Sequence, residues 1–385
     1  MQCHRARRPS RHVVDRGGYR HPTVRRVHLV IGHIISVLIF LTAITVVAEL
    51  ADSAGVFTVA AALAARLGGG RVWLLWLATS LVATLSTIFL SLDTTAVLLT
   101  PVVVTMAVRL GIPALPFAMT TVWLANTASL LLPVSNLTNL LALPSFNDLD
   151  IGYHGMVGWT WRPAVVAIGV TLVTLAVMFG RSMRGRYVLV PVEGPTDRVR
   201  FTVAAVVCVA LAAVLASGVN VVYPACTAAV VLIVVTAVRA RETLTWRLLP
   251  VRAVALAAVL FTVVGLAGQL GLTRVLTDVL PGGSDPSALF GLGFGSALAA
   301  NLVDNLPAFF ALLPVADDHP ARLVAVLIGT NVAPIVTMWA SLANILWRQR
   351  CSRAGLKISR LGFAARGAIL APIVTAACLA ALSWS

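Results

Sequence analysis

The chain has 385 residues, of which 59% are hydrophobic and 11% are charged, and its mean hydropathy is +0.94. This balance excludes a soluble globular domain and predicts a polytopic helical protein of the inner (cytoplasmic) cell membrane, with the lipid bilayer as its surroundings. The net charge of +15 does not indicate a nucleic-acid partner. Eight arginines against one aspartate lie in residues 1–28, and most other basic residues lie in short loops, where positive charge reports membrane topology.

Residues 29–180 are predicted to form a first transmembrane repeat, behind a basic segment at 1–28 that we expect to be a disordered tail. Apolar stretches of roughly bilayer-spanning length alternate there with short polar breaks. The expected segments are a helix over 28–50 with an amphipathic continuation to Arg66, arms over 72–92 and 96–109, a span over 113–143, a polar loop over 146–162 and a helix over 163–180.

Polar residues interrupt two of these segments. The two arms meet at residues 93–95, with the sequence Asp-Thr-Thr, and arginines at both outer ends predict a re-entrant hairpin that opens to the cytoplasm. The span over 113–143 is expected to be broken near 133–136, because a proline followed by Ser-Asn removes helix hydrogen bonds and offers replacements. In hydrocarbon such breaks persist only where they face protein or a water-filled cavity.

Residues 181–200 are rich in arginine and contain two prolines, which predicts a cytoplasmic linker. Residues 201–385 are expected to form the second repeat. The hairpin of this repeat, the second in the chain, is flanked by aspartates instead of arginines, which predicts that it opens to the opposite side of the membrane. The expected segments are helices over 201–217, 219–238 and 251–272, a hairpin over 287–314, a broken span over 321–347, a basic cytoplasmic loop over 348–360 and a helix over 363–384.

The two repeats are similar in sequence. At an offset of 205 residues Asn126 aligns with Asn331 and Asn139 with Asn344, and with small gaps AVLLTP at 96–101 aligns with FFALLP further on. We therefore expect an all-α polytopic membrane protein, an inverted-topology repeat with two re-entrant hairpins and two broken helices. Paired broken helices in corresponding positions are a sequence indication of a transporter site at the repeat interface.

Two intramembrane carboxylates, Asp93 and Asp304, are the leading candidates for the chemistry of that site. Carboxylates within membrane spans are energetically expensive and by default mark ion or substrate pathways. They can equally cap the amino terminus of a half-helix, and both roles can hold at a hairpin tip. Asp304 is the candidate counterpart of Asp93, although the alignment fits better when it falls on Ser91.

Neutral polar side chains in the hairpins and broken helices offer further donors and acceptors, either to a substrate or to neighbouring helices. Glu49 and Asp52 are expected where the first helix reaches the interface. The sequence contains no catalytic motif, and its five cysteines lack paired or metal-like spacing, so we expect no enzyme activity, cofactor or metal. The neutral candidates are Thr94, Thr95, Asn126, Thr127, Ser135, Asn136, Asn139, Asn305, Asn331, Thr337, Ser341 and Asn344.

LSLDTTAVLLTPVVV at 90–104, ANTASLLLPVSNLTNLLAL at 125–143 and ANLVDNLPA at 300–308 closely resemble the arsenite permease family. These arsenical pump membrane proteins belong to the ion transporter superfamily, which also holds sodium-coupled dicarboxylate carriers and sodium/proton antiporters. The resemblance implies hairpins and unwound helices around a central site. It also implies export of trivalent arsenic or antimony, driven by proton antiport or by a partner ATPase.

Two features depart from the family pattern. Leu92 stands where the family usually has asparagine before the first aspartate. The two helices over 201–238 have no counterpart in the first repeat, which predicts that the sequence starts internally or lacks one or two helices.

Arsenite at neutral pH is a small neutral trihydroxide, which amides and hydroxyls can bind. No cysteine lies in the predicted hairpins or broken spans, so capture by a thiolate is not expected. We predict a secondary transporter that exports arsenite, antimonite or another small oxyacid by alternating access, with protons or sodium as coupling ion and a cytoplasmic ATPase subunit as a further candidate partner. The alternatives are a sodium/proton antiporter or dicarboxylate-type small-anion carrier, and a truncated membrane scaffold without transport activity.

Overall fold

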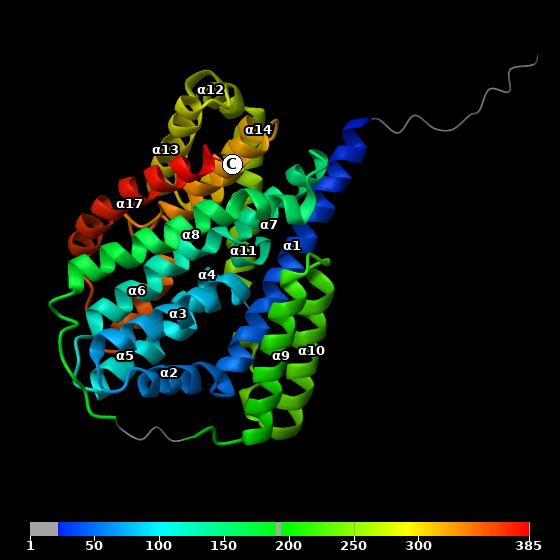
Figure 1. Ribbon diagram of the computed structural model, residues 1–385. Helices are drawn as coiled ribbons and strands as arrows, with labels where there is room; N and C mark the ends of the chain where they lie inside the picture. The colour runs from blue at the N-terminus through cyan, green and yellow to red at the C-terminus, as the bar shows by residue number, and fades with distance from the viewer. Residues whose placement is uncertain (1–21, 190–193, 250, 385) are drawn as a thin grey trace, which may run out of the picture. The chain divides into compact units, whose positions relative to one another are not determined.

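The computed structural model describes residues 22–189, 194–249 and 251–384 (Figure 1). Apart from one bridge between Arg71 and Arg186, the described residues form helices, turns and loops, which confirms the predicted all-α class. Two compact units, Met1–Ser36 and Val37–Ser385, divide the chain, and every hairpin and broken helix belongs to the second. Most of the expected basic tail lies outside the described residues.

Six helices among the described residues are long and apolar enough to cross a membrane, or seven if one bent pair counts as a single span. That pair, Leu38–Ser53 and Val56–Leu67, bends by 60°. Gly55 between them has φ 88°, a left-handed conformation that glycine adopts without steric cost. The bend therefore follows directly from the glycine, and it separates the first helix from its amphipathic continuation.

The first copy of the repeat contains a hairpin followed by a broken helix and a long final helix. The hairpin consists of α3 and a second arm that is interrupted by one π-helical turn, Thr95–Leu99. The helices are α1 (Pro22–Ser53), α2 (Val56–Leu67), α3 (Val72–Leu90), α4 (Leu92–Thr94), α5 (Thr100–Arg109), α6 (Ala114–Thr127), α7 (Leu137–Asp148) and α8 (Gly152–Phe179).

The second copy repeats this order behind two additional helices, α9 and α10, which pack side by side (Figure 1). Asp197 caps α9 and accepts a hydrogen bond from Arg239 at 2.6 Å, and this arginine lowers the pKa of Asp197. The helices are α9 (Arg198–Ala216), α10 (Val222–Arg239), α11 (Val251–Gln269), α12 (Leu272–Val279), α13 (Pro286–Leu302), α14 (Asn305–Ala316), α15 (Pro320–Leu327), α16 (Leu342–Arg353) and α17 (Arg360–Leu382), with a π-helical turn at Ile328–Val332 after α15.

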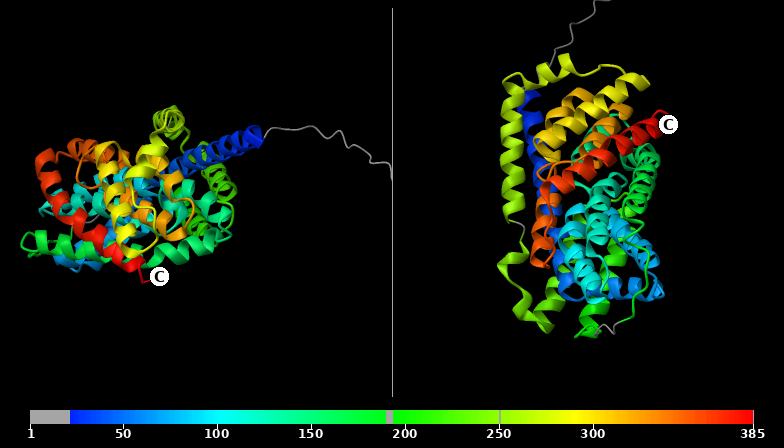
Figure 2. Two further views of the ribbon diagram at one scale, coloured as in Figure 1. Left: turned by 90° about the horizontal axis from the view of Figure 1, so that it is seen from above. Right: turned by 90° about the vertical axis from the view of Figure 1, so that its left-hand side faces the viewer.

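The two copies cross over in their packing. In the first copy α5 packs against α16 of the second, and α14 of the second packs against α7 of the first. The final helices, α8 and α17, run along each other (Figures 1 and 2). Within the unit Val37–Ser385, α2 and α3 lie toward one end and α12 and α13 toward the other (Figures 1 and 2). The broken helices are therefore buried between elements of both copies.

Large side chains close the interface between the copies. Trp123 on α6 and Trp347 on α16 are both fully buried. The indole of Trp347 donates a hydrogen bond to the carbonyl of Ala118 at 2.9 Å, so its polar atom is satisfied inside the core. Phe363 of α17 packs on the ring of Trp347 with centroids 5.6 Å apart. These contacts hold α16 between α6 and α17.

The prediction of a polar loop over 146–162 is wrong. Only residues 149–151 separate α7 from α8, and α8 continues through Pro163 to Phe179. A proline inside a helix removes one backbone hydrogen bond, which a long helix tolerates when tertiary packing supports it. Here α17 supplies that packing along α8. Glycines and tryptophans in this stretch therefore lie on a helix.

The predicted position of the first hairpin break is also wrong by two residues. The chain breaks at Ser91, not at residues 93–95, and Asp93 lies in the first turn of the second arm. In the second copy, α16 continues to Arg353, so part of the predicted basic loop is helical. Both differences arise because polar residues near a break cap or extend a helix as readily as they interrupt it.

Candidate substrate and ion site at the helix breaks

Four asparagines join the two broken helices at their crossing. The amide nitrogen of Asn126 donates to the side-chain oxygen of Asn344 at 3.0 Å, and that of Asn331 donates to Asn139 at 2.7 Å. All four side chains are at most 1% exposed. Because Asn126 corresponds to Asn331 and Asn139 to Asn344, the two bonds are related by the duplication. We call these four residues the asparagine cluster.

Within the asparagine cluster, Asn139 and Asn344 hold together the unwound segments of their own helices. Each side-chain amide donates two hydrogen bonds to backbone carbonyls that the break has freed from helix bonding. A buried carbonyl without a donor costs about 1–3 kcal/mol, so the amide makes the break tolerable. The accepting carbonyls are Ser129 and Leu132 for Asn139, both at 2.8 Å, and Pro334 and Thr337 for Asn344, at 2.7 and 3.3 Å.

One hydroxyl breaks the symmetry of the asparagine cluster. The side chain of Thr138 donates to the amide oxygen of Asn331 at 2.6 Å. At the corresponding position the second copy has Ala343, which offers no donor. The amide oxygen of Asn126 is buried and has no hydrogen-bond partner among the described residues. The first copy therefore carries a free buried acceptor at the crossing, and the second does not.

The second halves of both broken helices start at equivalent residues. Asn136 is the N-cap of α7, with φ −149°, and its side chain accepts from the backbone N–H of Thr138 at 3.3 Å. Ser341 is the N-cap of α16, with φ −151°. Both side chains are buried. Two predicted site residues thus define where the helices restart.

The hairpin breaks correspond at Ser91 and Asp304, as the sequence alignment favours. Ser91 is the N-cap of α4 and accepts from the backbone N–H of Thr94 at 3.3 Å. Asp304 is the N-cap of α14 and accepts from Leu306 at 3.0 Å. Asp93 therefore has no acidic counterpart, because its equivalent position is Leu306. The two copies carry their carboxylates on different positions of the same hairpin tip.

Asp93 and Asp304 nevertheless lie near each other, close enough to interact electrostatically. Both are partly buried, and among the described residues the Asp93 side chain has no hydrogen-bond partner. Each carboxylate lies at the amino terminus of a half-helix, where the helix dipole favours negative charge. The tips thus bring two carboxylates from different copies into one region.

Contacts between the hairpin tips and the broken helices differ between the copies. In the first, the hydroxyl of Ser135 donates to the carbonyl of Ile88 at 2.9 Å. In the second, the backbone N–H of Asn305 donates to the carbonyl of Ala340 at 2.8 Å. Both contacts attach a hairpin tip to the unwound segment that follows it, so the tip and the break form one unit.

Three predicted site residues make hydrogen bonds away from the asparagine cluster. Thr95 bonds to the hydroxyl of Ser86 at 2.9 Å and closes the first hairpin. Thr94 donates to the carbonyl one turn before it. Thr127 accepts from Thr171 of α8 at 3.0 Å. These hydroxyls connect helices within the first copy.

Asn301 is a central residue that the sequence reasoning missed. Its side chain donates to the carbonyl of Ala333 at 2.9 Å and accepts from the backbone N–H groups of Val336 and Thr337, both at 3.2 Å. Thr337 in turn donates to the Asn301 carbonyl at 2.8 Å. An amide three residues before Asp304 in an apolar arm was the available signal. Asn301 joins the second hairpin to the second break.

The longer α16 places a cysteine and a charged group on the second broken helix. Cys351 lies on α16 and is buried, beyond the end of the span over 321–347 in which no cysteine was expected. Arg350 on the same helix interacts electrostatically with Glu49 and Asp52 at the end of α1. No group of three or more His, Cys, Asp or Glu residues that could hold a metal occurs in the part of the chain that the structure describes.

The family profile of the citrate transporters (CitMHS) matches residues 18–344 of this chain. The chain belongs to the CitMHS family. Arsenical pump membrane proteins of Escherichia coli K12, Shigella flexneri and Yersinia enterocolitica are each 28% identical to this CitMHS protein over 365 residues, which cover 89% of the chain and 84% of each relative. Both findings identify a membrane transporter and confirm the resemblance to the arsenical pump proteins of the ion transporter superfamily.

The fold of this CitMHS protein is similar to a solved transporter structure. The crystal structure of the YdaH transporter of Alcanivorax borkumensis, described as having an unusual topology, superimposes with a TM-score of 0.58. The match covers 94% of this chain and 88% of YdaH at 14% sequence identity. At this identity the similarity shows a shared fold.

Proposed function

We propose that this CitMHS-family protein is a secondary transporter of the cytoplasmic membrane that exports arsenite, antimonite or a similar small oxyacid by proton antiport. The observation that carries the proposal is the asparagine cluster at the crossing of the two broken helices, with Asp93 and Asp304 at the adjoining hairpin tips. The names of the arsenical pump relatives support the choice of substrate. The two copies would open to opposite sides of the membrane, as their flanking charges predict.

The chemistry of the breaks fits a neutral oxyacid better than a multiply charged anion. A trihydroxide both donates and accepts hydrogen bonds, and side-chain amides complement it in both respects. A tricarboxylate would require positive charge at the site, because burying an unpaired anion is costly. Neither lysine nor arginine occurs in the tips and breaks, which span residues 86–101, 125–140, 297–314 and 329–346.

Asp93 is the residue that we assign to the coupling proton. Its carboxylate has no donor from the described residues, so a proton or cation can reach it without displacing a protein hydrogen bond. Asp304 differs, because its side chain also caps α14. A proton on Asp93 removes its electrostatic repulsion with Asp304, and its release can follow the change in access.

Alternating access requires the two copies to move relative to each other. The bonds between Asn126 and Asn344 and between Asn331 and Asn139 join the copies directly. Any such movement must stretch or exchange these bonds. A substrate hydroxyl that bonds to the same amides offers replacements, which links substrate binding to the change of state.

A sodium/proton antiporter is the second candidate, and the closeness of Asp93 and Asp304 favours it. Two carboxylates offer oxygen ligands, which suit a hard cation. In this alternative the amides would only stabilise the breaks. The dicarboxylate-type carrier lacks the basic residues that its substrate would need, and the inactive scaffold would bind neither proton nor substrate.

Uptake into everted membrane vesicles tests these functions. Vesicles come from a bacterial host without its own arsenite pump that expresses the full chain, and a pH gradient, acid inside, is imposed or collapsed. Arsenite, citrate and sodium are supplied in separate arms. We expect gradient-dependent arsenite uptake that Asp93→Asn abolishes. Asp278→Asn is the matched control, because Asp278 is exposed on α12 away from the breaks.

Each result has a distinct meaning. Arsenite uptake lost in Asp93→Asn but kept in Asp278→Asn supports proton-coupled export. Sodium uptake without arsenite uptake favours the antiporter. Citrate uptake assigns the family's named substrate to this chain and overturns the oxyacid proposal. No uptake in any arm, with equal protein in the membrane, supports the inactive scaffold.

A further inference from the structure

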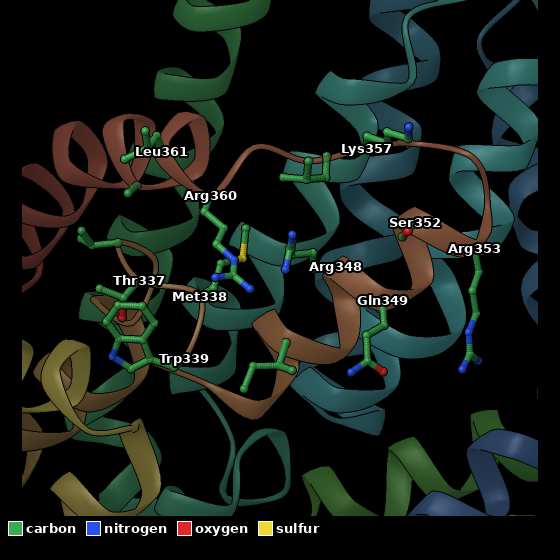
Figure 3. Close-up of a pocket in the computed structure, with 14 residues that line it drawn as sticks. Thr337, Met338, Trp339, Arg348, Gln349, Ser352, Arg353, Lys357, Arg360 and Leu361 are labelled. Carbon is green, nitrogen blue, oxygen red and sulfur yellow. The ribbon is translucent and has the colours of Figure 1, made fainter.

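A basic cavity of about 1040 Å³ lies between the second break, α16 and the start of α17 (Figure 3). It is separate from the asparagine cluster, although Thr337 borders both. Its polar lining comes from one face of α16 and from the segment that connects α16 to α17. The basic residues of this lining are Arg348, Arg353, Lys357 and Arg360.

The positive charge of the cavity has no counter-charge. No Asp or Glu lines it, and in the described parts of the chain none of the four basic side chains forms an ion pair. Figure 3 shows the guanidinium groups of Arg348 and Arg360 projecting toward the middle of the cavity from two different elements. Like charges that converge in this way repel each other, and an anion between them removes the repulsion.

The remaining lining is apolar and open to the surroundings. Trp339 is 53% exposed and Leu361 is 82% exposed, and both border the cavity together with Ile345. A site for a small soluble anion gains nothing from exposed apolar side chains beside its arginines. An amphiphile does, because its charged headgroup can contact the guanidinium groups while its chains cover the apolar residues.

The cavity also lies where anionic lipids gather. Arg360 is the first residue of α17, one of the helices that can span a membrane, so this arginine lies near a membrane boundary. Residues 348–360 contain five basic and no acidic residues, which predicts the cytoplasmic side. Basic pockets between membrane helices on that side bind the headgroups of anionic lipids.

We propose that this cavity binds an anionic phospholipid, with its phosphate between Arg348 and Arg360 and its acyl chains along Trp339 and Leu361. The lipid would join the end of α16 to the start of α17, the two elements that contribute its arginines. Since α16 also carries Asn344, lipid binding would stabilise the second broken helix from outside the transport site.

Lipid titration of the purified full chain tests the proposal. The protein is held in nanodiscs of phosphatidylcholine or in neutral detergent, and binding of phosphatidylglycerol is followed by native mass spectrometry. At roughly five-fold per arginine, the double variant Arg348→Gln/Arg360→Gln should bind about 25-fold more weakly. Arg181→Gln/Arg184→Gln is the matched control, because it removes two exposed arginines from another basic segment. Arg348→Lys/Arg360→Lys keeps the charge and should bind within a few-fold of the unchanged protein.

Three results overturn the proposal. Equal weakening in both glutamine double variants would show that phosphatidylglycerol senses only net charge. Saturable binding of inorganic phosphate as tight as that of the lipid would assign the cavity to a soluble anion. Equal binding of phosphatidylcholine would remove the role of the negative charge. Because every readout is binding, failure here is distinguishable from failure of the transport proposal.

Discussion

The two copies of the repeat break their helices at the same places and stabilise the breaks with equivalent amides, but they differ in the ionisable and hydroxyl groups around the breaks. Asn139 in the first copy and Asn344 in the second each donate hydrogen bonds to backbone carbonyls of their own break. Elsewhere the copies differ: the position of Thr138 in the first copy is occupied by Ala343 in the second, and that of Asp93 by Leu306. The comparison shows that the two copies share backbone geometry and the amides that satisfy it, whereas they differ in their ionisable and hydroxyl groups.

This difference distinguishes residues that stabilise the helix breaks from residues that are available for transport. A residue that makes the same bonds as an identical residue in the other copy, such as Asn139, is explained by the helix break. A group without such a counterpart, such as the carboxylate of Asp93 or the unbonded amide oxygen of Asn126, is not required by the break. The unpaired groups are therefore the ones that point to transport, and mutations in matched pairs can distinguish the two kinds.

The largest effect is expected for Asn139→Ala and Asn344→Ala. Each removes an amide that satisfies two carbonyls and one asparagine of the opposite copy, so each should lower the free energy of unfolding by about 3 kcal/mol. Chemical unfolding of the purified protein in detergent measures the loss. Asn147→Ala, an exposed change on the same α7 helix, should stay within about 0.5 kcal/mol. A large loss in only one copy would contradict the equivalence of the two breaks.

A smaller effect on stability is expected for the Thr138 hydroxyl, which has no counterpart in the second copy. Thr138→Ala should cost about 1.5 kcal/mol, since it leaves the Asn331 oxygen with only the long contact of 3.5 Å from the Thr330 hydroxyl. Ala343→Ser should stabilise by about 1 kcal/mol, because it offers the Asn126 oxygen the hydroxyl that the first copy provides to Asn331. The same unfolding measurement applies. Ala343→Val, which adds volume without a hydroxyl, is the control and should destabilise.

The bends ahead of both hairpins should respond alike. Gly55 has φ 88° and Gly271 has φ 105°, and each precedes a short helix. An alanine at either position should cost about 1 kcal/mol of stability through left-handed backbone strain. Gly158→Ala in the middle of α8, where nothing lies near an added Cβ atom, should be neutral or stabilising. Unequal losses at the two positions would indicate that the left-handed backbone conformation constrains only one of them.

The smallest effect concerns the hairpin caps. Ser91 has φ 114° and ψ 161°, a region that only glycine adopts easily, so Ser91→Gly should stabilise by about 0.5 kcal/mol after the loss of its cap. Asp304 has φ 159°, which is nearly extended, so Asp304→Gly relieves no strain and should lose only a few tenths of a kcal/mol. Thermal unfolding of the four proteins, including Ser91→Ala as a cap-free control, compares the two. A stabilised Asp304→Gly would contradict this difference.

Much of the fold and part of the site were accessible without coordinates. Apolar segment lengths predicted the membrane helices, and the offset between Asn126 and Asn331 predicted two related breaks. The prediction of a loop over 146–162 failed because glycine, tryptophan and arginine are compatible with a helix once α17 packs along it. Asn301 was missed because its one local bond, to the carbonyl of Ala297 a turn earlier, is an ordinary helix contact, and its partners in the second break lie 32 and more residues away.

By itself, the sequence determined the membrane class, the duplication and the approximate places of both helix breaks, because these depend on local hydropathy, on proline and on repeated amides. Only the tertiary structure decided that Asn126 bonds to Asn344 and Asn331 to Asn139, that Asp93 lies near Asp304, and that Ser91 is the break of the first hairpin. These relations join residues about 200 positions apart or depend on capping geometry. Pairings at such separations arise from packing between the copies, which no local pattern encodes.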